Sequence, residues 1–422
     1  MDQINKSVIN EGTTSIKESQ WFLDYQKQAL DQIEKLKAPK IERFDYSHWG
    51  LFKKEDADKG VFERPNEQAK ERIHDADFIL KSSGELERLK DRNEEIELLS
   101  FEELLDKDHQ DFKKLYLASD FTQFKDQFNA FNLAYLTTGI FIRIPKGVQV
   151  KEPIQLAFLD EKSKIKNKNH QIFIYAEENS AIELLETYVS IGDSDEVSKI
   201  NVHVHIQTEA GANVKYTTID ELDKNTQAFF RRTAKIGTDS TLELALGMMS
   251  DGDMIEDIQV DLLGTGSSAD VKAVAISHNQ QRQVVNSKVI NHGAHSVGNI
   301  YQHGVVLDQA TLTFNGLGDV LKNAKNSDAQ QESRILMLSE DARADTNPIL
   351  LIDEYELTAG HAASISRVDE GQLYYLMSRG LERVDAEKLV IRGFLGSVLS
   401  AISIEEVQKH LIETIERKLS AL

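Results

Sequence analysis

Five segments of this chain share one rhythm, and they read NSAIELL (179–185), GANVKYT (211–217), DSTLELA (239–245), SSADVKA (267–273) and HSVGNIY (295–301). Each begins with a pair of residues that are mostly small or polar, which is typical of a tight turn, and continues with the alternating side chains of a strand. The segments start roughly 30 residues apart, a period typical of stacked coils that cover one another's apolar faces. We therefore predict a solenoid in which each coil consists of two strands joined by a tight turn.

The strand-like pattern extends over residues 136–366, where short runs of alternating polar and apolar residues are separated by Gly, Ser, Asn and Asp. Such runs predict a mainly β core for this part of the chain. The five repeats match in spacing and in the pattern of polar and apolar residues, but they share few identical residues. A β-sandwich with regular turn spacing therefore remains an alternative.

Residues 1–135 are rich in Lys, Glu, Asp and Gln, and we predict that they form a helical N-terminal region. One apolar stripe has helical spacing and consists of Trp21, Tyr25, Ala29, Ile33 and Leu36. A second, aromatic stripe consists of Phe112, Tyr116, Phe121, Phe124, Phe128 and Phe131. We expect the aromatic stripe to pack in the core, with an interaction face as the alternative. Residues 37–66 hold two of the five prolines and no clear period, so they predict an irregular connection.

Residues 367–422 return to helical periodicity and form a predicted C-terminal helical domain. Asp369 stands where it can cap a helix that carries Leu373, Leu376 and Met377. The apolar stripes of these helices cannot all be covered within the domain. We expect them to pack against the strand body, against residues 1–135, or against another subunit.

Acidic residues outnumber basic residues by 70 to 49, which gives a net charge of −21. This charge opposes binding to nucleic acid and to anionic membranes, because basic side chains supply most of that attraction. No apolar run approaches the roughly 20 residues that span a bilayer. The first 30 residues also lack the apolar core of a signal peptide. We expect a cytoplasmic protein whose partners are proteins or cations.

The chain contains no cysteine. Disulfides, thiolate catalysis and Cys-ligated zinc or iron–sulfur sites built from this polypeptide alone are therefore excluded. The sequence shows no Walker loop, nucleophile elbow or paired-carboxylate motif. We predict no catalytic residue, no cofactor-binding residue and no enzyme activity.

Three groups of histidines are candidate metal ligands. His203 and His205 alternate in one strand and share a face, for which a solvated strand surface is the favoured interpretation. Residues 291–304 hold three histidines, but turn residues surround the first two and no carboxylate lies between them. His361 is the only ionisable side chain in residues 358–366, so a proton or a metal arriving there has one obvious acceptor. The alternative is that His361 hydrogen-bonds a turn.

Two stretches of the chain resemble the SufB/SufD family of iron–sulfur cluster assembly proteins. AGHAASISRVDEGQLYYLMSRGLERVDAEKLVIRGFL at residues 359–395 resembles the C-terminal signature of the family. GIFIRIPKGVQVKEPIQLAF at residues 139–158 resembles the family's entry to its strand body. The signature departs from the common pattern at Gly360, where Ser is usual, and at Ser366, where Gly is usual. Ala359 replaces a cysteine found in some members.

The resemblance implies a right-handed β-helix flanked by helical regions. It also implies a non-catalytic scaffold in a complex with SufB and the ATPase SufC that builds iron–sulfur clusters. The missing cysteines favour the SufD branch of the family. In that branch the late coils meet SufB, the C-terminal helices contact SufC, and a histidine that maps onto His361 is proposed to act with a SufB cysteine.

By this resemblance the chain alone binds no stable cofactor, and iron or a cluster is held transiently in the complex. A homodimer in the absence of partners is possible. Two other functions stay open from the residues alone. They are a β-helix carbohydrate-active enzyme, which uses carboxylates for acid–base chemistry, and a metal-free structural solenoid that assembles only with itself.

Overall fold

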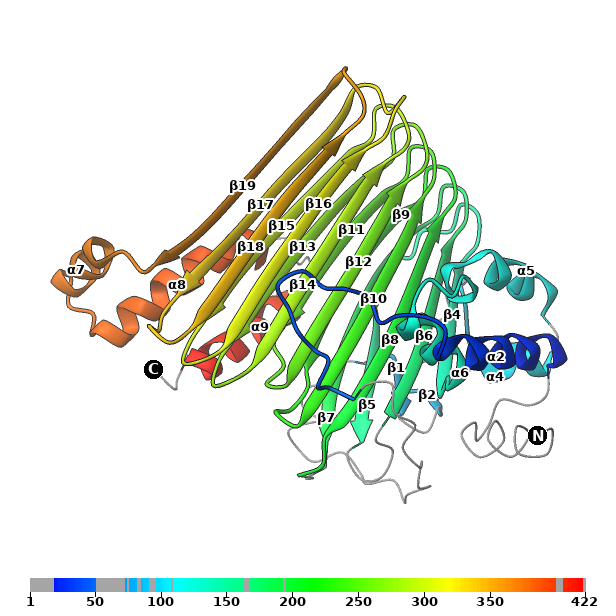
Figure 1. Cartoon of the computed structure of the whole chain (residues 1–422), viewed down its shortest axis with the longest axis horizontal. Helices are drawn as coiled ribbons and strands as arrows, with labels where there is room; N and C mark the ends of the chain where they lie inside the picture. The colour runs from blue at the N-terminus through cyan, green and yellow to red at the C-terminus, as the bar shows by residue number, and fades with distance from the viewer. Residues whose placement is uncertain are drawn as a thin grey trace.

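The computed structural model describes residues 19–50, 73, 76–81, 85–90, 96–107, 109–161, 167–192, 195–399 and 405–419. Its strands form two long sheets in one elongated body, and helices lie toward both ends of it (Figure 1). The ten-stranded sheet A has the order β19-β17-β15-β13-β11-β9-β7-β5-β1-β2. The nine-stranded sheet B has the order β18-β16-β14-β12-β10-β8-β6-β4-β3.

The strands of sheet A are β1 Phe78–Lys81, β2 Leu86–Arg88, β5 Ile154–Glu161, β7 Ala181–Ile191, β9 Asn213–Glu221, β11 Thr241–Met248, β13 Ser268–Ser277, β15 Val297–Val306, β17 Ser327–Met337 and β19 Leu357–Arg367. Those of sheet B are β3 Glu97–Ser100, β4 Thr138–Ile144, β6 Asn167–Ala176, β8 Ser198–Thr208, β10 Thr226–Ile236, β12 Asp253–Leu262, β14 Arg282–Asn291, β16 Thr311–Val320 and β18 Arg343–Ile352. The helices are α2 Gln20–Ile33, α4 Phe101–Asp106, α5 Gln110–Ala118, the short 3₁₀ helix η1 Asp120–Thr122, α6 Gln127–Ala134, α7 Glu370–Ser378, α8 Arg383–Leu399 and α9 Glu405–Leu419.

From β4 to β19, successive strands alternate between the two sheets, so each coil contributes one strand to each sheet. Within this span of the chain, neighbouring strands of each sheet pair in parallel, whereas the β1–β2 and β3–β4 pairs of the N-terminal region are antiparallel. Leu244 of β11, for example, lies beside Tyr216 of β9 and Val271 of β13. Parallel pairing of strands from successive coils defines a β-solenoid and excludes the antiparallel β-sandwich that the sequence left open. The predicted mainly β solenoid with helical flanks is confirmed.

The small residues of the repeats form one column of stacked turns. Each turn holds one residue with a positive φ, and these residues are Asn179, Gly211, Asp239, Gly266, His295 and Asn326. The turns bond to one another, as where the Gly211 amide donates to the Thr238 carbonyl at 2.9 Å. Gly, Asn and Asp adopt this left-handed backbone most readily, which explains the residue type at every one of these positions except His295. Asn326 begins a sixth repeat that the sequence pattern did not reveal.

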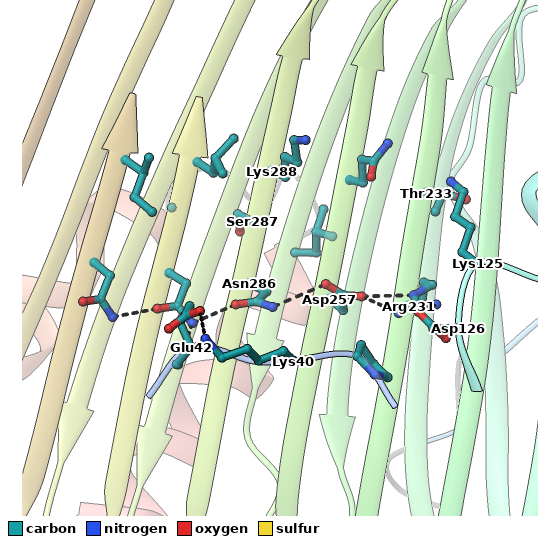
Figure 2. A pocket seen from close by; sticks show the side chains of 18 of the residues that line it. Lys40, Glu42, Lys125, Asp126, Arg231, Thr233, Asp257, Asn286, Ser287 and Lys288 are labelled. Atoms are coloured by element: carbon teal, nitrogen blue, oxygen red, sulfur yellow. Dashed lines mark hydrogen bonds and ion pairs between the residues drawn. The ribbon is translucent and has the colours of Figure 1, made fainter. Parts of the chain in front are cut away.

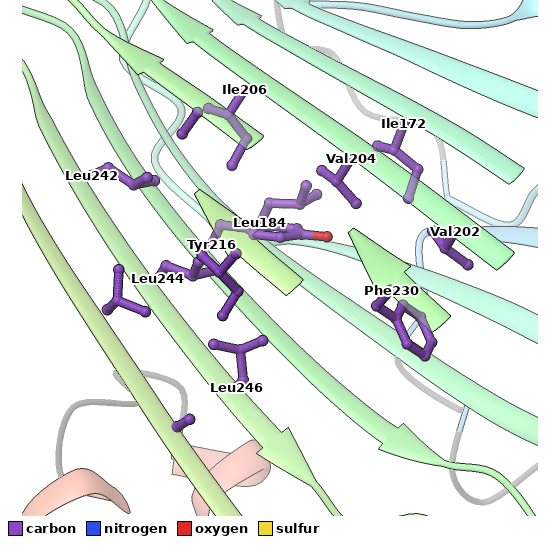
Figure 3. Close-up of a cluster of buried hydrophobic side chains, with 14 of the residues drawn as sticks. Ile172, Leu184, Val202, Val204, Ile206, Tyr216, Phe230, Leu242, Leu244 and Leu246 are labelled. Carbon is purple, nitrogen blue, oxygen red and sulfur yellow. The ribbon is translucent and has the colours of Figure 1, made fainter. Parts of the chain in front are cut away.

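The inner faces of the two sheets fill the space between them with apolar side chains (Figure 3). Alternate residues of each strand point inward and are buried, including Leu242, Leu244 and Leu246 of β11 and Val202, Val204 and Ile206 of β8. Period-two alternation is therefore the sequence signal for the inner face of every coil.

The N-terminal region covers the outer face of sheet B at its early coils. The aromatic stripe is divided among α5, η1 and α6 and is not one helix. Most of it is buried, and Phe128 of α6 stacks on Phe229 of β10 with ring centroids 3.7 Å apart. The expectation of core packing is confirmed. The region also contributes three short strands, β1, β2 and β3, to the two sheets.

Residues 38–49, here called the strap, lie against the outer face of sheet B. The strap is irregular, as predicted, but it is not a free loop. Ile41, Phe44 and Trp49 are buried against an apolar surface formed by Phe229, Ile255 and Val284 of three successive sheet B strands. The rest of the predicted connection, residues 51–66, lies outside the described residues.

Of the C-terminal helices, α8 and α9 cover the outer face of sheet A. Asp369 caps α7, because its carboxylate accepts hydrogen bonds from the Gly371 and Gln372 amides at 2.7 and 3.2 Å. Apolar side chains of α8 and α9 are buried against β9, β11, β13 and β15, so these helices pack on the strand body of their own chain. No helix in the described ranges is long and apolar enough to span a bilayer.

A cluster of ionisable groups lies inside the apolar core. Arg232 forms an ion pair with Glu256, while Tyr188 bonds Glu186 and Ser250 bonds Asp220. Burial raises the pKa of Glu186 to about 7 and the pKa of Asp220 to about 6. The single positive charge of Arg232 cannot neutralise three buried carboxylates, those of Glu186, Asp220 and Glu256. Some of these carboxyl groups must therefore remain protonated near neutral pH.

Replacement of Gly266 by Ala tests the turn column. Gly266 has φ of +69°, and a methyl group there would overlap the Asp239 carboxylate of the preceding turn. Gly147 has φ of +76° but open space around it, so Gly147→Ala isolates the backbone effect. We expect Gly147→Ala to lower the free energy of unfolding by about 1–2 kcal/mol. Gly266→Ala should lower it by roughly 1 kcal/mol more. If urea titrations gave the same loss of unfolding free energy for Gly147→Ala and Gly266→Ala, the stacking of the turns would be contradicted.

Replacement of Glu186 by Gln tests the buried carboxylates. Because the pKa of Glu186 is about 7 in the folded chain, its stabilising contribution is present at low pH and is lost as pH rises toward and past 7. The free energy of unfolding of Glu186→Gln, relative to the unmodified chain, should therefore increase by roughly 2 kcal/mol from pH 5 to pH 8. Glu183→Gln, on the outer face of the same strand, is the control. A pH-independent difference for Glu186→Gln would refute the raised pKa.

Candidate functional site

The solenoid is open at its C-terminal end. β18 and β19 are the last strands of their sheets, and within the described residues no further coil covers them. Four large apolar side chains are exposed on these strands, and they are those of Ile349, Leu351, Ile352 and Ile365. An edge strand also presents unpaired backbone N–H and C=O groups, which bind readily to another strand. Exposed apolar side chains on two open edges indicate a protein interaction surface.

His361 lies on this open end, in the middle of β19. It is paired in register with Gln331 of β17, which is paired in turn with Ile300 of β15. Ile300 and Gln331 are buried and point into the core, so His361 belongs to an inward-facing column. The His361 residue is nevertheless exposed, because the column ends there. Within the described ranges, no hydrogen bond or ion pair holds its imidazole, and the alternative of a turn hydrogen bond receives no support.

The interior beside His361 is polar, unlike the core of the earlier coils. The Gln331 amide Nε2 donates to the Ile349 carbonyl at 2.9 Å. The Ser333 hydroxyl donates to Gln302 Oε1 at 2.9 Å. Gly318 makes room for this arrangement, since a Cβ there would lie 2.7 Å from Gln331 Nε2. The last coils therefore place an exposed imidazole against buried amide and hydroxyl groups.

His203 and His205 are buried, and the interpretation as a solvated strand face is wrong. Both point away from the solenoid core, but the N-terminal region covers this part of sheet B. His205 Nδ1 lies 2.8 Å from Thr233 Oγ1, and its ring is 5.9 Å from that of Phe121. Burial lowers the pKa of His205 to about 3, because a protonated ring at this position would be a cation without contact with water.

The three histidines in residues 291–304 are not brought together. His292 pairs with Asp261 at 2.9 Å, and His303 pairs with Glu332 at 2.9 Å, while His295 occupies a stacked turn. The described part of the chain contains no group of three or more His, Asp or Glu that could hold a metal ion. His361 can therefore supply one ligand, and a partner would have to supply the others.

A groove between the strap and sheet B contains a polar ladder that the sequence analysis did not find (Figure 2). The groove has a volume of about 590 Å³. Along its floor, Asn347 donates to Asn315 at 2.8 Å and Asn315 donates to Asn286 at 2.7 Å. The ladder continues to Asp257, which pairs with Arg231 at 2.8 Å. The available signal was the recurrence of Asn at the solenoid period of roughly 30 residues.

A second exposed apolar surface lies on the C-terminal helices. We call it the α7–α8 patch, and it consists of Tyr374, Tyr375, Met377, Leu381, Val384 and Leu389. α7 projects beyond the strand body (Figure 1). Exposed apolar side chains on the projecting helix α7 and on the first half of α8 indicate a second protein interaction surface, separate from the open end.

The protein is a β-solenoid with two exposed apolar surfaces and an exposed histidine at its open end, which are features of a protein that assembles with others. Residues 158–394 match the family model described as SUF system FeS cluster assembly, SufBD core domain. The chain therefore belongs to the SufB/SufD family of SUF iron–sulfur cluster assembly proteins. It is similar to the iron–sulfur cluster assembly protein SufD of Bacillus subtilis, with 36% identity over 421 residues and 95% of each chain covered.

More distant relatives match a shorter part of the chain. A SufBD family protein of Mycobacterium leprae is 28% identical over 270 residues, which cover 63% of this chain and 30% of the relative. One of Staphylococcus saprophyticus is 23% identical over 292 residues, which cover 68% of this chain and 62% of the relative. Coverage of nearly the whole chain distinguishes the SufD relative from these two.

Replacement of His361 and of His303 by Ala tests the different surroundings of the two side chains. His361 makes no described polar contact, so His361→Ala should change the free energy of unfolding by less than about 0.5 kcal/mol. His303 is buried, pairs with Glu332 and stacks on Phe394, so His303→Ala should lower it by roughly 1–3 kcal/mol. A large loss for His361→Ala in chemical denaturation would show that the imidazole has a structural role.

Proposed function

We propose that this chain is a non-catalytic scaffold subunit that acts with a SufB-like chain and a SufC-like ATPase in de novo iron–sulfur cluster assembly. The SufB-like chain docks on the open end formed by β18 and β19, and His361 offers one ligand to iron or to a nascent cluster at the junction. The observation that carries the proposal is the exposed imidazole of His361 at the end of an inward-facing column.

The chemistry of the metal ligands supports a site to which this chain gives an imidazole and the SufB-like partner gives thiolates. A neutral imidazole is a competent iron ligand, and iron–sulfur clusters accept mixed nitrogen and sulfur ligation. This chain has no cysteine, so the thiolates must come from the SufB-like partner. Iron and the cluster are then cargo of the complex, held transiently at the shared junction.

The α7–α8 patch is the proposed docking site of the SufC-like ATPase. α8 also rests on sheet A, because Ile391 and Leu395 are buried against the outer face of that sheet. The backbone carbonyl of Phe394 lies 3.3 Å from His303 Nδ1 in β15. A nucleotide-driven movement of the ATPase would thus act, through α8, on strands close to the open end and reshape the junction.

The remaining parts of the proposal concern the isolated chain. We expect no enzyme activity and no stable cluster, a cytoplasmic location, and self-association through the open end when partners are scarce. The alternative of a carbohydrate-active enzyme would require carboxylates in an accessible cleft. Glu186, Asp220 and Glu256 lie close together but are buried inside the solenoid. Asp126 and Asp257 line the accessible groove, but both pair with Arg231, at 2.7 and 2.8 Å.

Iron content of the purified complex tests the role of His361. The tagged chain is co-expressed with its SufB-like and SufC-like partners, and iron and acid-labile sulfide are measured per complex. We expect His361→Ala to form the complex normally but to retain at most about one tenth of the iron, because loss of a ligand strongly weakens metal binding. His292→Ala is the control, because His292 is a half-exposed histidine on a turn two coils earlier. Unchanged iron content in His361→Ala would remove the proposed role.

A further inference from the structure

Arg43, at the tip of the strap, has an unusual backbone conformation. Its φ is +58°, whereas most other non-glycine residues with a positive φ in the described ranges are Asn or Asp. A long side chain at such a position is unfavourable and persists only when its surroundings impose it. Here Ile41 and Phe44, two residues before and one residue after, are both buried and hold the turn against sheet B.

The strained turn brings Arg43 to the edge strand at the open end. Arg43 Nη1 lies 3.3 Å from Asp345 Oδ1 of β18, across a separation of 302 residues in the sequence. The carbonyl of Glu42 accepts a hydrogen bond from the Asn315 amide of β16 at 3.2 Å, which fixes the tip on the sheet. Figure 2 shows Glu42 beside the amide ladder that ends at this edge.

Arg43 shares the Asp345 carboxylate with a second guanidinium. Arg343 Nε lies 3.1 Å from Asp345 Oδ2. The side chains of Arg43 and Arg343 remain 59% and 67% exposed, while that of Asp345 is 13% exposed. A guanidinium has five N–H donors in a planar fork, so most donors of both arginines still face solvent at the edge of sheet B. Such a fork matches the geometry of a carboxylate.

We propose that Arg43 and Arg343 bind a carboxylate side chain of the SufB-like partner when it docks on β18 and β19. The inference rests on the proposed docking of that partner at the open end. It adds an N-terminal residue to an interface otherwise formed by the last coil. It also accounts for an arginine at a position where Gly would relieve the backbone, because Gly cannot supply the guanidinium.

Replacement of Arg43 by Gly separates binding from folding. Arg43→Gly removes the guanidinium and relieves the backbone, so the thermal midpoint of the isolated chain should stay unchanged or rise. The Kd for the SufB-like chain, measured by titration at 50 mM NaCl, should increase about tenfold. The difference should shrink at 300 mM NaCl, because salt screens an exposed ion pair. Lys40→Gln, which removes an exposed cation elsewhere on the strap, should leave the Kd unchanged.

The outcomes distinguish this inference from the proposed function. If the unmodified chain does not bind the SufB-like chain, the proposed function fails. If the unmodified chain binds and Arg43→Gly binds equally tightly, only the role of Arg43 is overturned. A lower thermal midpoint for Arg43→Gly would also overturn it, because the arginine would then serve the fold.

Discussion

Register between successive coils is the constraint on which the rest of the structure depends. From β6 to β17, each strand pairs in parallel with the strand of its sheet one coil earlier and one coil later, so that like positions form columns along the solenoid. A slip of one residue would turn the apolar inner face of a coil outward, which makes the register strongly preferred. Every coil needs a neighbour on each side, and an end without a neighbour stays exposed.

The two ends of the solenoid differ in how far they are covered by other parts of the chain. At the first coils, β1 and β3 from the N-terminal region extend the sheets, and the aromatic helices cover the outer face of sheet B. At the last coil, β18 and β19 remain open, and the column that contains Ile300 and Gln331 ends in an exposed His361. A side chain at the end of a core column is held in place by the coils behind it and is accessible to solvent. These are the two properties that a site shared between subunits requires.

Helices and strap link surfaces that are remote in the sequence. α8 and α9 bury their apolar side chains on sheet A, while α7 projects with exposed aromatic side chains. The strap joins the N-terminal region to the edge strand through Arg43 and Asp345. The strap and the C-terminal helices thus both reach the late coils, which places the proposed ATPase site and the proposed partner interface on one connected scaffold.

The amino-acid sequence by itself predicted the repeat, the helical flanks and the cap at Asp369, and it favoured a solenoid over a β-sandwich, because alternation and turn chemistry depend on residues close together in the chain. It also singled out His361 as the isolated ionisable residue of its strand. Only the tertiary structure decided which outer faces are covered. His203 and His205 occupy an alternating strand that looks solvated, yet the N-terminal helices bury them. The division of the aromatic stripe, the packed strap and the contact of Arg43 with Asp345 were equally hidden. They arise from packing between segments far apart in the chain, for which no local periodicity exists.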